Sequence, residues 1–147
     1  MKNNMSQGQK ANQNGKMFED ETWDYLEKNG HSPLEPPGHE AIWFGGTRLN
    51  KTDIFLPARN IQIECKFQAV SGTCDEKLPT TLLNASEKVK CDYYILLYGG
   101  PHWTEHKRGA NIIRFLKKFA GELNASPHSD GAKKILVMDL DELKEWL

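Results

Sequence analysis

The chain is poor in cysteine, and its cysteines form no paired motif. The three cysteines, Cys65, Cys74 and Cys91, include no C-x-x-C pair. The sequence therefore indicates neither a disulfide framework nor a four-cysteine zinc site. Free thiols suit a reducing compartment, so we expect a cytoplasmic protein. The sequence also lacks an apolar run of the roughly 20 residues that a membrane helix needs, and residues 1–14 lack the apolar core of a signal peptide.

A strong charge of either sign is missing as well. The formal net charge is −1, although charged residues make up 27% of the chain. This balance excludes a generic basic surface for nucleic acid, so any DNA contact must come from local clusters. With 147 residues and 38% hydrophobic residues, the chain can bury the core of one domain. We expect a disordered polar leader over residues 1–14 and a single domain over residues 15–147.

Two alternating runs stand out, over residues 51–56 and 61–69, with the turn signal Pro57-Ala58-Arg59-Asn60 between them. Successive side chains of a strand point to opposite faces, so the contents of each face can be read from the alternation. The apolar face holds Ile54, Leu56, Ile61, Ile63, Cys65 and Phe67, and the polar face holds Asp53, Gln62, Glu64, Lys66 and Gln68. The pattern predicts a hairpin with one face in a core.

The turn length predicts the register of this hairpin. If Leu56 lies opposite Ile61, Asp53 lies directly opposite Glu64, with Cβ atoms roughly 4.5–5.5 Å apart. Two facing carboxylates destabilise a sheet unless a cation neutralises them. Mg²⁺ binds one or two carboxylates together with water and substrate phosphate oxygens, and Lys66 on the same face could orient an attacking water. The alternative is a solvated hairpin whose charges have no catalytic role.

Hydrophobic patterns along the chain predict an alternation of helices and strands, with β-strands adjacent in the first half. The expected elements are a helix over about residues 16–29 capped by Asn14, strands at about 40–44, 51–56 and 61–69, a helix from near Pro79 to about Lys90, a strand at 92–98, a helix at 108–123, a strand at 134–138 and a helix at 139–147. The first three strands should be antiparallel neighbours, and the strand at 92–98 should run parallel to 61–69. The order αβββαβ predicts an α/β fold with a mixed central sheet flanked by helices.

Asp53, a spacer and then Glu64-Cys65-Lys66 resemble the signature of the PD-(D/E)xK nuclease superfamily, also called restriction-endonuclease-like. Thr52 stands where that signature has Pro, and Gln68 matches a Gln often found two residues after its Lys. Residues 15–19 resemble the first-helix pattern of the superfamily, and residues 71–79 resemble a segment that follows the Lys in restriction-type and phage-borne members. The order αβββαβ is also the core of that fold.

This resemblance implies a Mg²⁺-dependent endodeoxyribonuclease in which Mn²⁺ can substitute. Asp53, Glu64 and the Cys65 carbonyl would bind metal with help from Glu19, Lys66 would position the attacking water, and Gln68 would steady the water or Lys66. Glu19 matches the family pattern, although Asp20 and Glu21 are neighbouring candidates on the helix. Two active sites are needed to cut both strands, so we expect a homodimer acting on DNA. Two alternatives are a Holliday-junction or repair nuclease acting on branched or damaged DNA, and a non-catalytic DNA-binding module.

Residues 99–108 combine Trp103, His102 and His106 with two basic residues. Such a mixture can stack on bases and hold phosphates, or it can be an ordinary exposed loop. Further basic residues that could touch DNA are Arg48, Lys77, Arg114, Lys117 and Lys118. His102 and His106 also have a spacing that suits zinc on a helix, but the sequence offers no third ligand nearby.

Overall fold

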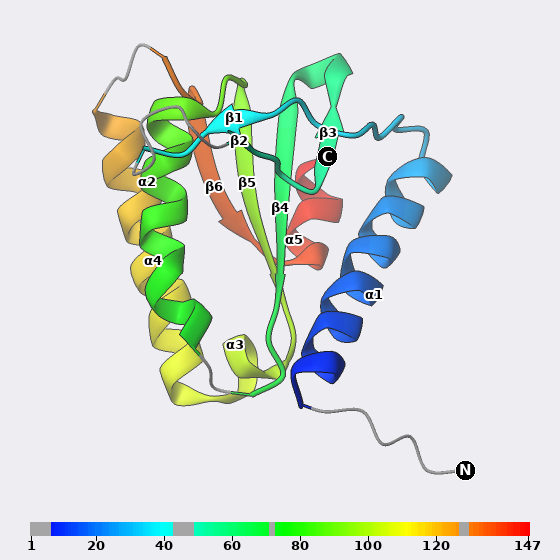
Figure 1. Cartoon of the computed structure of the whole chain (residues 1–147), viewed down its shortest axis with the longest axis vertical. Helices are drawn as coiled ribbons and strands as arrows, with labels where there is room; N and C mark the ends of the chain where they lie inside the picture. The colour runs from blue at the N-terminus through cyan, green and yellow to red at the C-terminus, as the bar shows by residue number, and fades with distance from the viewer. Residues whose placement is uncertain (1–6, 43–48, 71–72, 127–129) are drawn as a thin grey trace.

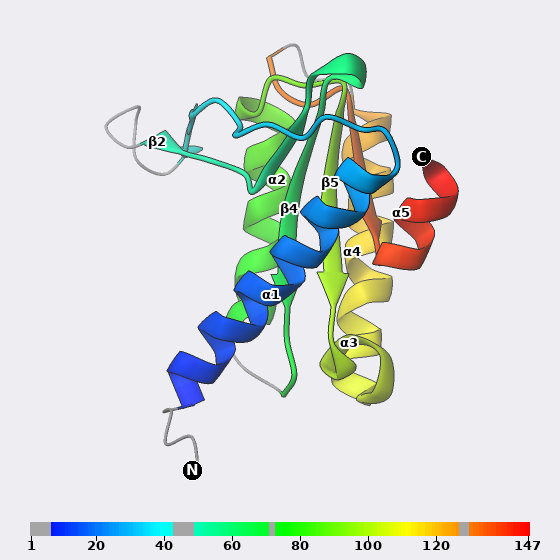
Figure 2. The same cartoon turned by 90° about the vertical axis from the view of Figure 1, so that its right-hand side faces the viewer.

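The computed structural model describes residues 7–42, 49–70, 73–126 and 130–147, which form a sheet with helices on both faces (Figure 1). The helices are α1 (Gln7–Lys28), α2 (Leu78–Lys88), α3 (Pro101–Glu105), α4 (Lys107–Ala125) and α5 (Leu140–Trp146). Helices α1 and α5 pack on one face, and α2 and α4 pack on the other. Figure 2 shows α1 lying across the front of the sheet. The expected α/β fold is confirmed, and none of the described helices is long and apolar enough to cross a bilayer.

The main sheet has the order β3-β4-β5-β6. Its strands are β3 (Ile54–Leu56), β4 (Ile61–Phe67), β5 (Tyr93–Gly99) and β6 (Lys134–Met138). Strands β3 and β4 are antiparallel, with Leu56 opposite Ile61 as predicted, and Asn60 in the turn adopts the left-handed conformation with φ 52°. Strand β5 is parallel to β4 and β6 is parallel to β5. The sheet is therefore mixed, as the sequence predicts.

The prediction of three adjacent antiparallel strands is wrong in the described part of the chain. Strands β1 (His39–Glu40) and β2 (Leu49–Asn50) pair with each other in a separate ladder. The segment after β1 is held by helix α2, because the Ile42 N–H donates to the Asn84 Oδ1 at 2.7 Å and the Asn84 Nδ2 donates to the Glu40 carbonyl at 3.3 Å. A side chain of α2 thus takes the hydrogen bonds that the predicted strand would have made with its neighbour. Residues 43 and 44 of that predicted strand lie outside the described residues.

Helix α1 begins at Gln7 instead of near residue 16, so Asn14 lies within the helix and does not cap it. Residues 7–14 of the predicted disordered leader are therefore helical, and residues 1–6 lie outside the described residues. The physical reason is that Gln, Lys and Ala lose little side-chain freedom in a helix. Downstream, the buried Phe18, Thr22 and Leu26 anchor the same helix on the sheet.

The two faces of the hairpin differ in how far they are buried. Ile54, Ile61 and Ile63 belong to the core cluster that α1 covers, which confirms the predicted apolar face. On the opposite face, Gln62 is only 2% exposed, and its Oε1 accepts a hydrogen bond from the Thr52 hydroxyl at 2.8 Å. The polar face of β4 is therefore buried at Gln62 and half-buried at Glu64, Lys66 and Gln68.

Candidate active site

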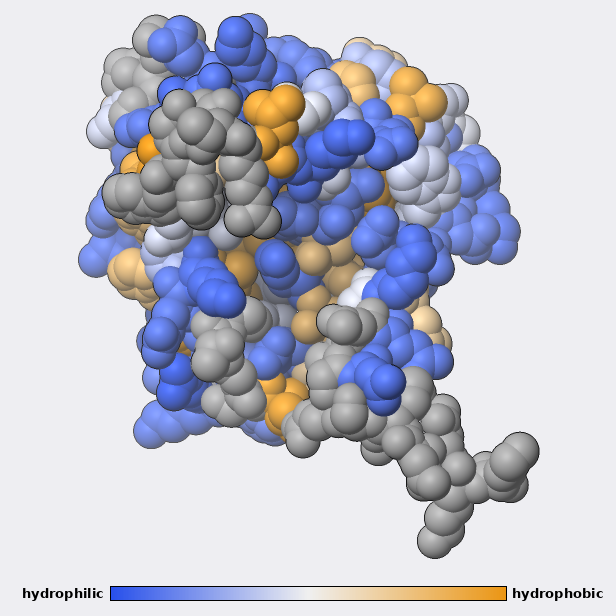
Figure 3. Space-filling view, in the orientation of Figure 1, coloured by the Kyte–Doolittle hydropathy of each residue, from blue (hydrophilic) through white to orange (hydrophobic). Residues whose placement is uncertain are grey.

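The candidate site lies on the edge of β4 where its antiparallel partner ends. The last pair of the β3–β4 ladder is Ile54 with Ile63. Beyond it, residues 64–67 pair with β5 on one side, and no strand pairs with their other edge in the described ranges. Figure 1 places this part of β4 between α1 and α2. In Figure 3 this face is mostly hydrophilic, with a recess between the α1 and α2 sides that has hydrophobic atoms at its base.

Asp53 leaves the ladder through a bulge. Its N–H donates to the Ile63 carbonyl at 3.0 Å, although Ile63 already pairs with Ile54. Asp53 and Ile54 thus both lie opposite Ile63. Two residues opposite one is the arrangement of a β-bulge, which redirects a side chain. The predicted direct opposition of Asp53 and Glu64 in the ladder is therefore wrong. The two carboxylates nevertheless meet, because Glu64 hydrogen-bonds to the redirected Asp53 side chain.

The Asp53 side chain also caps the open edge of β4. Its Oδ2 accepts a hydrogen bond from the Cys65 backbone N–H at 2.7 Å. The N–H and C=O of one strand residue point to the same side of the strand, so the Cys65 carbonyl faces the same edge. Two carboxylates and one backbone carbonyl therefore converge there.

Burial raises the pKa of Glu64 well above its usual range, and the hydrogen bond and charge of Asp53 raise it further. The Lys66 ammonium acts in the opposite direction and lowers the pKa of Glu64. Glu64 therefore holds a proton more tightly than an isolated carboxylate would. The pair is thus an electrostatically unfavourable arrangement that a bound cation would relieve.

Helix α1 adds a third carboxylate at the border of the site. Burial raises the pKa of Glu19, and the charge of Asp53 raises it further. Lys16 approaches the Glu19 Oε1 at 3.9 Å and pairs more closely with Asp20, at 3.1 Å. Glu19 is therefore the first-helix acid that senses the Asp53 charge, whereas Asp20 is exposed and bound to Lys16. No contact of Glu21 with the site is seen in the described part of the chain.

Close packing fixes the position of Glu19. The neighbouring Phe18 ring lies against Gly99 of β5, where a Cβ atom would come within 2.7 Å of the ring. Thr22 is fully buried, and its hydroxyl donates to the Phe18 carbonyl at 2.9 Å. The absence of a side chain at Gly99 thus lets α1 approach the end of β5.

Lys66 and Gln68 follow Glu64 along the same strand. Lys66 shares the Glu64 face by alternation, and its positive charge acts to lower the pKa of Glu64. Gln68 lies past the end of β4, where its N–H donates to the Gly99 carbonyl at 3.0 Å and its carbonyl accepts from the His102 N–H at 3.1 Å. Gly100, with φ +104°, leaves no room for a Cβ beside the Gln68 carbonyl. The backbone at Gln68 is therefore firmly held.

Cys65 contributes its backbone and not its sulfur. The thiol lies on the core side, as predicted, and hydrogen-bonds with Thr22. Burial raises the pKa of the Cys65 thiol, and the charges of Asp53, Glu64 and Glu19 raise it further. The thiol therefore stays protonated at neutral pH, and it suits neither a nucleophile nor a thiolate ligand.

The chemistry of these donors suits a hard cation. Within the described ranges, no three His, Cys, Asp or Glu side chains are grouped so as to hold a metal ion. A cation at this edge would depend on Asp53, Glu64 and the Cys65 carbonyl, with water in its remaining positions. Such an oxygen donor set fits Mg²⁺, which keeps several waters, and does not fit zinc.

Thr52 is a residue of this site that the sequence did not reveal as important. It stands before Asp53, where the superfamily signature has Pro, and it is buried with its hydroxyl on Gln62. This hydrogen bond ties the segment that carries Asp53 to β4. The feature of the sequence that could have indicated its role is the presence of Thr52 where the signature has Pro.

The predicted DNA-contact segment has a different structure. His102 and Trp103 are buried in α3, with 0% and 2% exposure, so both the DNA-contact and the exposed-loop interpretations are wrong for them. The His102 Nε2 lies 3.2 Å from the Asp75 Oδ2, which also accepts from the Arg108 Nε at 3.1 Å. These contacts join the segment before α2 to α3 and α4. His106 is exposed, and in the described residues it belongs to no group of metal-binding side chains with His102.

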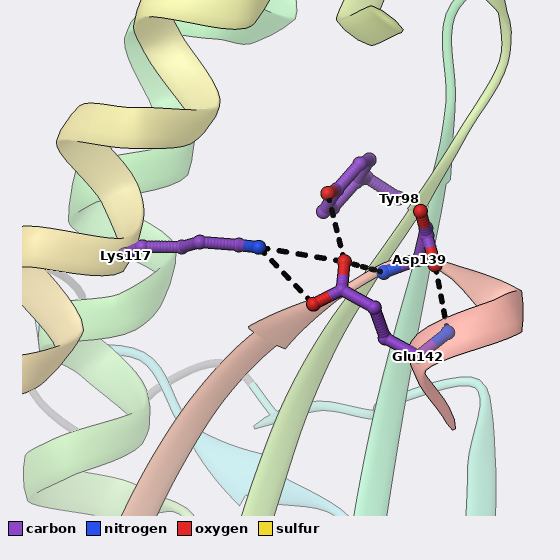
Figure 4. A network of polar contacts seen from close by, with 4 residues as sticks. All are labelled: Tyr98, Lys117, Asp139 and Glu142. Carbon is purple, nitrogen blue, oxygen red and sulfur yellow. Dashed lines mark hydrogen bonds and ion pairs between the residues drawn. The ribbon is translucent and has the colours of Figure 1, made fainter. Parts of the chain in front are cut away.

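The basic residues predicted to reach DNA differ in their surroundings. Lys77, Arg114 and Lys118 are exposed, and Arg48 lies outside the described residues. Lys117 binds the Glu142 Oε2 at 3.1 Å, within a network that includes Tyr98 and Asp139 (Figure 4). Lys117 therefore has a structural role that links α4 to α5.

Comparison with known families identifies one match. A family model described as a PD-(D/E)XK nuclease superfamily domain matches residues 46–147. The matched range contains Asp53, Glu64 and Lys66, whereas Glu19 lies before it. Searches of curated proteins and of solved structures found no match.

Proposed function

Because this chain belongs to the PD-(D/E)XK nuclease superfamily, we propose that it is a Mg²⁺-dependent endonuclease that hydrolyses DNA phosphodiester bonds. The observation that carries the proposal is the grouping of Asp53, Glu64 and Lys66 at the open edge of β4. Two neighbouring, half-buried carboxylates lower the stability of the fold, and proteins retain such a cost where function requires it. Metal-assisted hydrolysis is such a function.

In this proposal Asp53, Glu64 and the Cys65 carbonyl hold the cation, and Glu19 assists from α1. A bound Mg²⁺ lowers the pKa of water and offsets charge on the phosphoryl oxygens, and Mn²⁺ can replace it. Lys66 donates a hydrogen bond that orients the attacking water and stabilises charge that develops in the transition state. Gln68, whose backbone is held at the end of β4, steadies the water or the Lys66 ammonium.

The test is nicking of supercoiled plasmid DNA by the purified full chain with Mg²⁺, with Mn²⁺ and with EDTA. The expected result is metal-dependent cutting that Asp53→Asn and Lys66→Ala abolish. Lys28→Ala is the matched control, because Lys28 is exposed at the far end of α1 and pairs only with Asp24 among the described residues. Cutting that persists in EDTA or in Lys66→Ala contradicts the mechanism.

Calorimetric titration separates a nuclease from a non-catalytic DNA-binding module on the same fold. We expect one Mg²⁺ or Mn²⁺ site that Asp53→Asn removes. Absence of metal binding together with absence of cutting would favour the non-catalytic module. Because cutting both strands needs two sites, we also propose a homodimer on DNA, which light scattering with and without duplex would test.

A further inference from the structure

Glu64 lines a second feature besides the edge of β4. A cavity of about 310 Å³ lies between the β1–β2 ladder, helix α2 and strands β4 and β5. The fully buried Tyr94 is part of its wall, and Thr80, Thr81 and Asn84 face it from α2. The cavity volume falls at the lower end of the range for small-ligand sites, about 300–1,000 Å³. A group bound there would therefore lie directly beside the candidate metal site.

The polar groups of the cavity can form hydrogen bonds with the edge of an uncharged ring. The His39 Nδ1 is buried and has no hydrogen-bond partner in the described part of the chain. Burial lowers the pKa of His39, so its ring is neutral at pH 7 and offers one donor and one acceptor. The Thr80 hydroxyl adds a further donor and acceptor. Asn84 lines the cavity, but its side chain already forms hydrogen bonds with the backbone of Ile42 and Glu40.

The charges around the cavity disfavour a phosphate. His39 is neutral, and the ammonium of Lys51, which also lines the cavity, binds the Glu35 Oε1 at 3.1 Å. An anion would therefore find no unpaired cation among the described residues that line the cavity. A flat, uncharged group with hydrogen-bonding edges needs no cation, and in a DNA substrate that group is a base.

We infer that this cavity receives one base turned out of the DNA stack next to the scissile phosphate. The inference rests on the proposed nuclease function and names its substrate class: DNA in which a base is unpaired at the cutting position. Turning out a base costs a few kcal/mol of stacking and pairing, and least where the base is already unpaired. The enzyme therefore cuts mismatched, bulged or branched DNA in preference to continuous duplex.

The first experiment compares single-turnover cleavage of two duplexes that differ only in one unpaired base. We expect the full chain to cut the duplex with the unpaired base at least about tenfold faster, which corresponds to about 1.4 kcal/mol. His39→Phe and Thr80→Val should move this ratio toward one. Thr104→Val, on the exposed surface of α3, is the matched control and should keep the ratio. Equal rates on both duplexes with the wild-type protein would overturn the inference while leaving the nuclease in place.

A second readout does not depend on cleavage. Replacement of the unpaired base by 2-aminopurine, in Ca²⁺ instead of Mg²⁺, should give a fluorescence change on binding that His39→Phe and Thr80→Val reduce. A response to free 2-aminopurine deoxynucleotide, with none to the DNA, would overturn the inference in favour of a free-nucleotide site. If the DNA gives the response and no substrate is ever cut, the base site stands and the proposed hydrolysis fails.

Discussion

The Asp53 carboxylate takes the place of a missing strand beside Cys65. Its Oδ2 accepts the Cys65 N–H at 2.7 Å, at the point where β3 has stopped pairing with β4. One side chain therefore satisfies the backbone of an open edge and, in the proposed mechanism, would also help to hold the metal. The structural and the chemical contribution of Asp53 can be separated by substitution.

Asp53→Ala should destabilise the protein by about 1–3 kcal/mol, because it leaves the half-buried Cys65 N–H without an acceptor. Asp53→Asn keeps an oxygen acceptor and removes one of two neighbouring negative charges, so its stability should equal or exceed that of the wild type. Urea unfolding measures both. Neither variant should bind Mg²⁺ at this site. An Asn variant that is as unstable as the Ala variant would contradict the assigned role of the hydrogen bond.

Lys66→Ala should reduce the cleavage rate by about 10²–10³-fold, the usual cost of losing one group that stabilises the transition state. DNA affinity should change little, because the loss concerns the reacting phosphate alone. Single-turnover kinetics in Mg²⁺ and fluorescence anisotropy in Ca²⁺ measure the two quantities. A parallel loss of affinity and rate would instead make Lys66 a DNA-binding residue.

Gly99→Ala should cost about 1–3 kcal/mol, because the new methyl group displaces the Phe18 ring. It should also slow cleavage several-fold, since Phe18 positions Glu19. Gly121→Ala in α4 is the matched control: a Cβ there meets nothing within 4 Å, so the variant should gain about 0.5–1 kcal/mol of stability. Thermal unfolding and plasmid cutting measure both variants. Unchanged cleavage in a folded Gly99→Ala protein would remove Glu19 from the mechanism.

Glu142 should make the stability of the protein depend on pH. Burial acts to raise the pKa of Glu142, but the Asp139 N–H, the Lys117 ammonium and the Tyr98 hydroxyl outweigh it, and the net pKa is lowered (Figure 4). Its contribution is therefore present above the unfolded pKa of about 4.3 and is lost as the pH falls through the lower folded pKa.

The measurement is urea unfolding of wild type and Glu142→Gln between neutral pH and about pH 3. Because Glu142 and Lys117 are partly exposed, we expect a difference of no more than about 1 kcal/mol at pH 7. The difference should vanish at the acidic end. A difference that grows as the pH falls would have the wrong sign for this network.

The sequence predicts the hairpin well, because alternation and turn length are local properties. The apolar face of Ile54, Ile61 and Ile63 and the pairing of Leu56 with Ile61 are both observed. The position at which the ladder ends is not local. It depends on the bulge at Asp53, which the alternation alone does not encode. Asp53 and Glu64 therefore meet through their side chains and not as directly opposed residues of the ladder.

Other differences arise from packing between segments that are distant in the sequence. The side chain of Gln62 on the polar face of β4 is buried, and the segment after β1 is held by Asn84 of helix α2. Trp103 is buried in a helix of five residues, which is too short to show a periodic pattern. A polar, glycine-flanked segment of this kind resembles a loop until its buried partners, such as Asp75, are known.

The open edge of β4 also bears on association between chains. An unpaired strand edge can add a strand from a second molecule, and proteins prevent this with charged side chains at the edge. Asp53, which caps the Cys65 N–H, and Lys66, which follows on the same strand, lie where such a strand would bind. We therefore expect the residues proposed for catalysis to hinder edge-to-edge aggregation as well, so that a variant without both charges should aggregate more readily than the wild type.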